Sequence, residues 1–232
     1  MTSEASIQTL DRLQGASIQE QVDRAINQLL DSFPDPGQLS ANQRRGIIAR
    51  YTAVLEGNFI YWMTATYLSV RSEEARSKIL DNLREEIRDC HPGMMRRFAM
   101  AAHAVPTDSD ALDVYEDLTN VRLFVGRLSA VRIVLMMAFF EGFIQRFMAY
   151  LAELATAQGS VELEYTDVHG VCDITHTQEL FRALAAEMAL NPVEPAANLF
   201  EGVDLLRTLM QNIVVGTGCK TDSGVHTRLA AR

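Results

Sequence analysis

The sequence has little of what marks several protein classes. Its three cysteines, Cys90, Cys172 and Cys219, form no Cys-x-x-Cys pair, which argues against a disulfide framework or a zinc ribbon. It has no cluster of Lys and Arg among aromatic residues, and its net charge is −9, so we expect no nucleic-acid partner. The first residues lack the basic start and apolar run of a signal peptide. We therefore expect a cytoplasmic protein that acts on a small molecule.

Strands and linkers are also missing from the pattern. No run alternates apolar and polar residues for long enough to form a strand, and no Pro/Gly/Ser-rich linker separates two domains. Apolar residues instead recur at helical spacing. We predict an all-α fold, a single bundle of seven to eight helices over residues 16–215, between a flexible arm at 1–15 and a flexible tail at 216–232. The expected helices span about 17–33, 40–70, 72–89, 94–105, 111–124, 131–158, 168–190 and 196–215.

One apolar stretch, Val131–Ala152, is long enough for a membrane helix but carries Arg132, Glu141, Gln145 and Arg146. Each of these polar side chains would cost several kcal/mol in the hydrocarbon of a bilayer. We interpret the stretch as the central buried helix of the bundle and expect no membrane partner.

Three residues with metal-binding side chains recur at helical spacing in the segment 161–190. Asp173 follows His169 by four residues, and His176 follows Asp173 by three. At roughly 100° per residue the three side chains fall within about 60° of one another around the helix axis. Two imidazoles and a carboxylate on one stripe can bind a metal ion, although unrelated histidines and a solvated aspartate fit the same spacing.

Carboxylates also occur where burial is expected, which is costly unless they are paired or bind metal. Glu141 has apolar residues at nearly every neighbouring helical position, so it either pairs with Arg132 or Arg146 or binds a cation. Glu56 lies within another apolar run, AVLEGNFIYWM, where the adjacent Gly57 and Asn58 also permit a solvated edge.

A third group stands at a helix junction, where Glu85 and Glu86 precede His91 and Pro92. Together with the other candidates, these residues offer more ligands than one metal ion needs. Carboxylates and imidazoles without thiolates favour iron or manganese, and a mixed set of six suits two metal ions in the core of a helical bundle.

These residues resemble the heme-oxygenase-like diiron oxidases. Members of that family carry a helix ending in Asn-Leu-x-x-Glu, a His that starts the next helix, a lone Glu in a long apolar helix, and His-x-x-x-Asp-x-x-His. This chain has the same order, with Asn82 fixing the match at Glu86 rather than Glu85. The resemblance implies that two Fe²⁺ ions are held by Glu86, His91, Glu141, His169, Asp173 and His176.

The resemblance also implies an activity. Two irons with dioxygen and an external reductant would remove a hydrogen atom from an unactivated carbon, with no catalytic residue beyond the metal ligands. The strings EGNFIYWM and HPGMMRRFA look most like the amino-acid-processing members, which form azetidines or nitriles in natural-product biosynthesis. We therefore expect a small amino-acid substrate such as isoleucine or valine, oxidised by desaturation and C–N cyclisation to an azetidine; C–C cleavage or nitrile formation by the same site is the alternative.

The expected substrate contacts lie on two of the long helices. Glu56 would either supply an extra carboxylate to the metal site, as in some members of the family, or hold the ammonium group of the substrate. Arg132 or Arg146 would hold the substrate carboxylate, and Trp62 and Phe140 would line an apolar pocket. Glu179, one turn beyond His176, is expected to support a ligand through a hydrogen bond.

Two other functions and a second kind of partner stay open at this stage. A metal-independent hydrolase on the same helical scaffold would use a cysteine nucleophile, and a non-enzymatic binding module would use the apolar face of Val131–Ala152. The sequence also leaves a homodimer open.

Overall fold

The structure is a computed structural model that describes residues 18–190 and 198–216. These residues are helical and contain no strand, which confirms the predicted all-α class. The arm predicted at 1–15 and all but Gly216 of the tail predicted at 216–232 lie outside the described residues, so both stay predictions.

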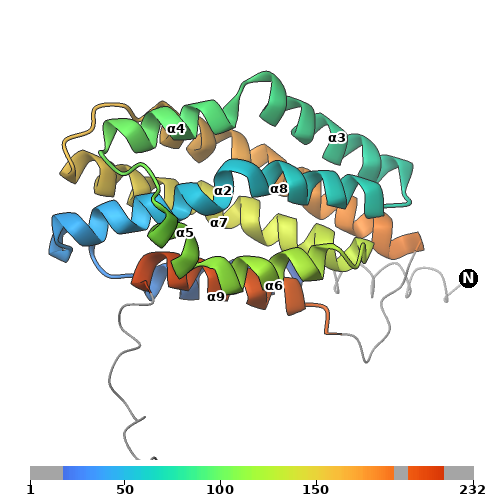
Figure 1. The fold of residues 1–232 in the computed structure, drawn as a ribbon. Coiled ribbons are helices and arrows are strands. Elements are labelled where there is room, and N and C mark those ends of the chain that lie inside the picture. The colour runs from blue at the N-terminus through green and yellow to red at the C-terminus, as the bar shows by residue number, and fades with distance from the viewer. Residues whose placement is uncertain (1–17, 191–197, 217–232) are drawn as a thin grey trace, which may run out of the picture.

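The helices run lengthwise along one another (Figure 1). A first helix occupies residues 18–31. The elements that follow are η1 (Pro36–Gln38), α2 (Ala41–Ser69), α3 (Glu73–Arg88), α4 (His91–Ala101), α5 (Asp108–Asp113), α6 (Tyr115–Val125), α7 (Ala130–Ala157), α8 (Glu164–Leu190) and α9 (Glu201–Val215).

Local hydrogen bonds explain where several helices begin. The Ser40 hydroxyl accepts from the backbone N–H of Gln43, whose side chain reaches back to Ser40, and this capping box starts α2. The Ser72 hydroxyl accepts from the backbone N–H of Ala75 at the start of α3. Caps of this kind satisfy N–H groups that have no partner within the helix, so they fix the boundaries that the sequence predicted for these two helices.

Several predicted boundaries were wrong, including the start of the last helix, which was expected at 196 and lies at Glu201, where α9 begins. The helix expected at 94–105 is α4, which starts at His91 because Cys90 adopts a left-handed conformation, with φ of 56°, and turns the chain there. The helix expected at 111–124 is divided into α5 and α6 at Val114. The helix expected from 168 begins at Glu164, and the acidic side chains of Glu164 and Asp167 favour its positive N-terminal end.

The centre of the bundle is α7, which packs most extensively against α8 and also contacts α2 and α9. By length and composition it could cross a membrane, but 78% of its most apolar window is buried by other helices of the protein. Val131–Ala152 is therefore the buried central helix that the sequence predicted. Its burial holds Glu141 in the interior, facing α8.

Candidate metal centre

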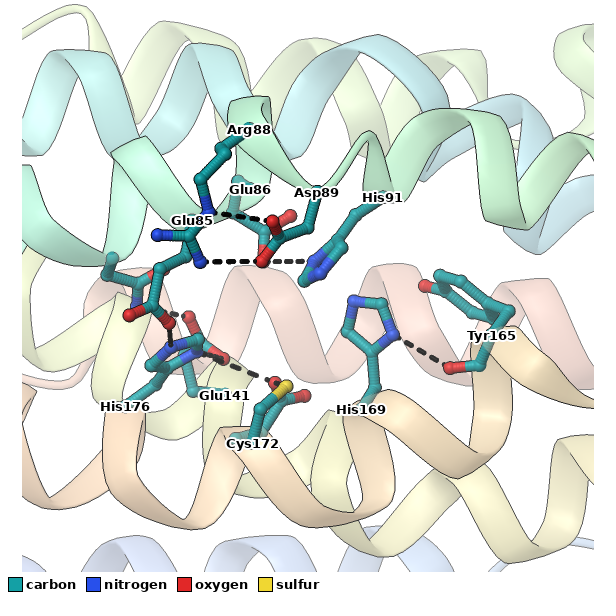
Figure 2. A network of polar contacts seen from close by, with 12 residues as sticks. Glu85, Glu86, Arg88, Asp89, His91, Glu141, Tyr165, His169, Cys172 and His176 are labelled. Atoms are coloured by element: carbon teal, nitrogen blue, oxygen red, sulfur yellow. Dashed lines mark hydrogen bonds and ion pairs between the residues drawn. The ribbon is translucent and has the colours of Figure 1, made fainter.

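Four helices bring the six predicted ligands to one place in the core (Figure 2). The end of α3 supplies one carboxylate, the start of α4 one imidazole, and the middle of α7 another carboxylate. The remaining three side chains come from consecutive turns of α8. Each residue is at most 5% exposed: Glu86, His91, Glu141, His169, Asp173 and His176.

The junction between α3 and α4 brings Glu86 and His91 together although only five residues separate them. The left-handed Cys90 ends one helix and starts the next, so the two side chains face each other rather than diverging. Glu86 Oε1 lies 2.8 Å from His91 Nδ1. His91 also stands edge-on to His169, with ring centroids 4.5 Å apart.

One group of ligand atoms consists of Glu86, His91 and His169, whose donor atoms lie within 4.8 Å of one another. The Nδ1–H of His169 donates to the backbone carbonyl of Tyr165 at 2.8 Å. Because a metal-bound histidine usually donates its other N–H to such an acceptor, this contact leaves His169 Nε2 free to bind metal.

A second group contains Cys172, Asp173 and His176, again within 4.8 Å. His176 Nδ1 lies 3.6 Å from Asp173 Oδ1 and 3.8 Å from Glu141 Oε2. Glu141 also accepts a hydrogen bond from the Asn82 amide at 2.8 Å through its other oxygen. Glu141 therefore contacts the second group from α7, opposite the stripe on α8.

Burial dominates the electrostatics of this cluster. It raises the pKa of Glu86, and it raises the pKa of Asp173 to about 7 together with repulsion from Glu141. Burial and the neighbouring His91 lower the pKa of His169 to about 4, so this imidazole is neutral near pH 7. A neutral imidazole is the form that binds metal.

The other two histidines, His91 and His176, compensate the negative charge of the buried carboxylates. Burial lowers the pKa of His91, but the contact with Glu86 outweighs it and the net shift is upward. At His176 burial also acts downward, while contacts with Asp173 and Glu141 raise the pKa to about 11. Protons on these imidazoles therefore offset the buried negative charge where no cation is bound.

The residues fit a metal ion on the basis of their unpaired atoms. Asp173 Oδ2, His176 Nδ1 and the Asn82 amide oxygen are buried side-chain atoms without a hydrogen-bond partner. Buried polar atoms nearly always have a partner, so a cation that satisfies Asp173 and His176 would remove this cost. Carboxylates and imidazoles match the donor preference of iron or manganese.

Two openings reach the cluster from different sides. An apolar cavity of about 20 Å³, enough for about one water molecule, lies against the first ligand group, Glu141 and Asp173. Its remaining wall is formed by Leu55, Phe59, Ile60, Pro92, Met95, Ile144 and Tyr165. A polar groove of about 540 Å³ between α3 and α8 reaches His176 from the opposite side.

The structure does not place Arg132, Trp62 or Phe140 at the cavity. Arg132 pairs with Glu201 of α9 at 3.2 Å, because its position on α7 faces that helix. Trp62 and Phe140 are fully buried and pack edge-to-face against each other with ring centroids 5.4 Å apart, so they belong to the core.

The other predicted contacts have partners of their own. Glu56 forms an ion pair with Arg96 of α4; neither side chain lines the apolar cavity, although the adjacent Leu55 and Met95 do. Arg146 pairs with Asp23 of the first helix, at 2.5 Å. Glu179 lines the polar groove that also reaches His176, and its carboxylate lies 3.9 Å from the Lys78 ammonium. The described residues show no hydrogen bond from Glu179 to a ligand, so the predicted contact is not seen.

Three residues at the site were missed by the sequence reasoning. Tyr165 precedes His169 by one helical turn, a spacing that could have identified it. Its ring lies tilted against that of His169, with centroids 4.3 Å apart, and its hydroxyl hydrogen-bonds to that of Tyr51 at 2.9 Å. Met95 and Arg96 carry no comparable signal, because their approach to α2 depends on how the two helices pack.

Comparison with known proteins agrees with this geometry. Among curated proteins, no sequence matches the chain. A family model described as "iron-containing redox enzyme" matches residues 48–210, which is more than half of the chain and includes all six buried ligands. The chain therefore belongs to the iron-containing redox enzyme family of helical, heme-oxygenase-like proteins.

Proposed function

We propose that the protein is a non-heme diiron oxidase that uses dioxygen to oxidise a small amino acid in natural-product biosynthesis. The observation that carries this proposal is the convergence of six buried carboxylate and imidazole side chains from four helices, with unpaired atoms at Asp173 and His176. A single ion rarely uses so many protein ligands, whereas a pair can share them.

The distances between ligand atoms define two groups, each of which would hold one ion. Glu86, His91 and His169 would hold one ion, and Asp173 and His176 the other. Glu141 lines the cavity beside Glu86 and also faces His176, so its carboxylate would be shared between the ions. Asn82 orients this carboxylate by donating to one of its oxygens.

When bound, a reduced iron pair supplies dioxygen activation and hydrogen-atom removal from an unactivated carbon. The chain's own residues provide the setting for this chemistry. The apolar wall of Leu55, Met95 and Ile144 excludes water and orients an aliphatic side chain. If desaturation and ring closure each consume one dioxygen, the substrate gives two electrons per step. Reduction of one dioxygen to two water molecules takes four, so an external reductant supplies the other two in each step.

The Glu56–Arg96 ion pair supports an amino-acid substrate. Glu56 follows Leu55 and lies one turn before Ile60, while Arg96 follows Met95, and all three apolar neighbours line the cavity. A zwitterion carries the two charges needed to replace this pair, with its ammonium on Glu56 and its carboxylate on Arg96. In this proposal Arg96 takes the role that the sequence analysis gave to Arg132 or Arg146.

The cavity must widen for such a substrate, because an amino-acid side chain needs more than its present 20 Å³. Met95 is unbranched and can change rotamer at little cost, and opening the Glu56–Arg96 pair frees the adjacent turns of α2 and α4. A branched aliphatic amino acid fits the apolar lining best, which favours azetidine formation over nitrile formation from an aromatic substrate.

The cysteine-dependent hydrolase receives less support. The Cys172 thiol donates to Asp173 Oδ1 at 3.1 Å, and burial together with that carboxylate raises its pKa. Because the thiolate is the nucleophilic form, a protonated Cys172 is poorly suited to attack a substrate.

The decisive experiment is anaerobic iron titration followed by oxygen exposure with each proteinogenic amino acid. We expect about two iron ions per protein and amino-acid-dependent oxygen consumption, with the product identified by mass spectrometry. Arg96→Ala should raise KM for the amino acid, whereas Arg132→Ala, the matched arginine away from the cavity, should leave KM unchanged. Binding of less than one iron per protein would refute the diiron site, and equal effects of the two arginine variants would refute the substrate contact.

A further inference from the structure

Glu85 makes a contact that the six-ligand set does not explain. Its Oε2 atom lies 3.0 Å from His176 Nε2, at the wall of the polar groove between α3 and α8 (Figure 2). The Glu85 side chain is 45% exposed, whereas that of Glu86 is 4% exposed. The two consecutive glutamates therefore occupy different surroundings.

Helix geometry accounts for this division. Consecutive residues on a helix point about 100° apart, so α3 directs Glu86 toward His91 and Glu85 toward His176. The arginines that share the groove have other partners, since Arg84 lies 3.5 Å from Asp81 and Arg88 lies 2.7 Å from Asp89. The Glu85 carboxylate is thus available to the imidazole.

The two nitrogens of His176 face opposite directions. Nε2 meets Glu85 at the groove, while Nδ1 is buried, has no hydrogen-bond partner and faces Asp173 and Glu141. A histidine that binds metal through one nitrogen donates from the other, and the acceptor fixes both the tautomer and the ring orientation.

We propose that Glu85 is a positioning residue that accepts the Nε2–H of His176 and thereby presents Nδ1 to the metal. Glu85 does not bind the ion itself, whereas Glu86 does. This inference rests on the proposed metal centre, to which it adds a carboxylate–histidine–metal arrangement on the groove side.

The test compares Glu85→Ala with Glu85→Gln by titrating metal-free protein with Co²⁺ in a calorimeter. A glutamine carbonyl still accepts from Nε2–H but is a poor ligand in place of a carboxylate. We expect Glu85→Gln to bind both ions with nearly unchanged affinity, and Glu85→Ala to bind one of them about 10- to 100-fold more weakly. Glu74→Ala, at an exposed position on α3, is the matched control and should leave both affinities unchanged.

Three results would overturn the inference. Loss of one ion to the same extent in both variants would make Glu85 a direct ligand. Unchanged affinity in Glu85→Ala would show that the contact has no role. Wild-type protein that binds no Co²⁺ would refute the metal centre and this inference together. The first two results, in contrast, would refute only the role of Glu85. Circular dichroism of each metal-free variant checks that the substitution at the half-exposed Glu85 does not disturb folding.

Discussion

Asn82 on α3 and Glu141 on α7 are joined by a buried hydrogen bond of 2.8 Å, in which the amide N–H donates to the carboxylate. Asn82 is 3% exposed and Glu141 1%. Water cannot replace a lost donor at such a depth, so this contact both fixes the carboxylate and connects two helices that are distant in sequence.

Asn82→Leu should destabilise the metal-free protein by about 1–3 kcal/mol, because Glu141 Oε1 loses its donor while remaining buried. Urea unfolding followed by circular dichroism measures the change. Asn120→Ala, at an exposed position on α6, serves as the control and should change stability by less than about 0.5 kcal/mol. A wild-type-like midpoint for Asn82→Leu would contradict the proposed role of this hydrogen bond.

Metal binding should stabilise the fold, and Asp173 should be required for it. Asp173 is fully buried with one unpaired oxygen, so its charge is costly until a cation satisfies it. Ligand at about 100 times its Kd adds about 2.7 kcal/mol to the free energy of unfolding. We expect Co²⁺ to raise the Tm of the wild type, and Asp173→Asn to abolish most of that rise while leaving the metal-free Tm unchanged or higher.

The control for Asp173→Asn is a variant in which the metal ligands are intact. Asp81→Asn alters an exposed carboxylate in the polar groove and should keep the Co²⁺-dependent rise in Tm. If Asp173→Asn kept the same rise as the wild type, Asp173 would not be a metal ligand.

Asp110 should make stability depend on pH in the acid range. Burial acts upward on its pKa, but hydrogen bonds from Arg45 at 2.7 and 2.8 Å and from Thr107 outweigh burial and hold the pKa below the ordinary aspartate value. A depressed pKa stabilises the fold above the unfolded-state value and loses that effect as the pH falls through the folded-state value. Asp110→Asn should therefore cost about 1–3 kcal/mol at pH 7, and much less near pH 3.

Urea unfolding of the wild type and Asp110→Asn at several pH values tests this expectation. Asp108→Asn, one residue from the same cap but exposed, is the matched control. A difference between wild type and Asp110→Asn that stayed constant from pH 7 to pH 3 would show that ionisation of Asp110 is not involved.

Gly202 marks a close approach between α9 and its neighbours. A Cβ atom there would lie 2.5 Å from the Phe124 ring and 3.0 Å from the Met136 Cβ, and both neighbours are buried in the core. Gly202→Ala should destabilise the protein by about 1–3 kcal/mol through overpacking.

Gly57 in α2 offers the opposite case, because a Cβ atom there meets nothing within 4 Å. Gly57→Ala should stabilise the protein by about 0.5–1 kcal/mol, since alanine favours the helix interior. Thermal unfolding of the two variants side by side should shift Tm in opposite directions. A shift of the same sign in both would show that helix propensity rather than packing governs Gly202.

Local patterns were sufficient to predict the helical fold and four of the candidate ligands, whereas Glu86 and His91 were assigned through the resemblance to a known family. The stripe of His169, Asp173 and His176 follows from helical periodicity alone, and the burial of Glu141 follows from its apolar neighbours. Caps such as Ser40 mark helix starts within a few residues because their hydrogen bonds are local.

Contacts between distant helices could not be derived in this way. The pairs Glu56–Arg96 and Glu85–His176 depend on how each helix is rotated against its neighbour, which a single sequence does not encode locally. The start of α4 at His91 depends on a left-handed Cys90, a conformation that non-glycine residues seldom adopt. The sequence therefore indicated which six side chains the fold brings together, but not the contacts around them.

The spacing of His169 and Asp173 along α8 limits where a residue can be inserted into the chain. His169 and Asp173 are four residues apart on an uninterrupted helix, so the separation of the two ligand groups is set at about 6 Å of rise by the backbone itself. One residue inserted within that interval would rotate Asp173 and His176 by about 100° away from Glu141, with no loop to absorb the change. The spacing between the ligands of α8 therefore cannot change by one residue without separating Asp173 and His176 from Glu141.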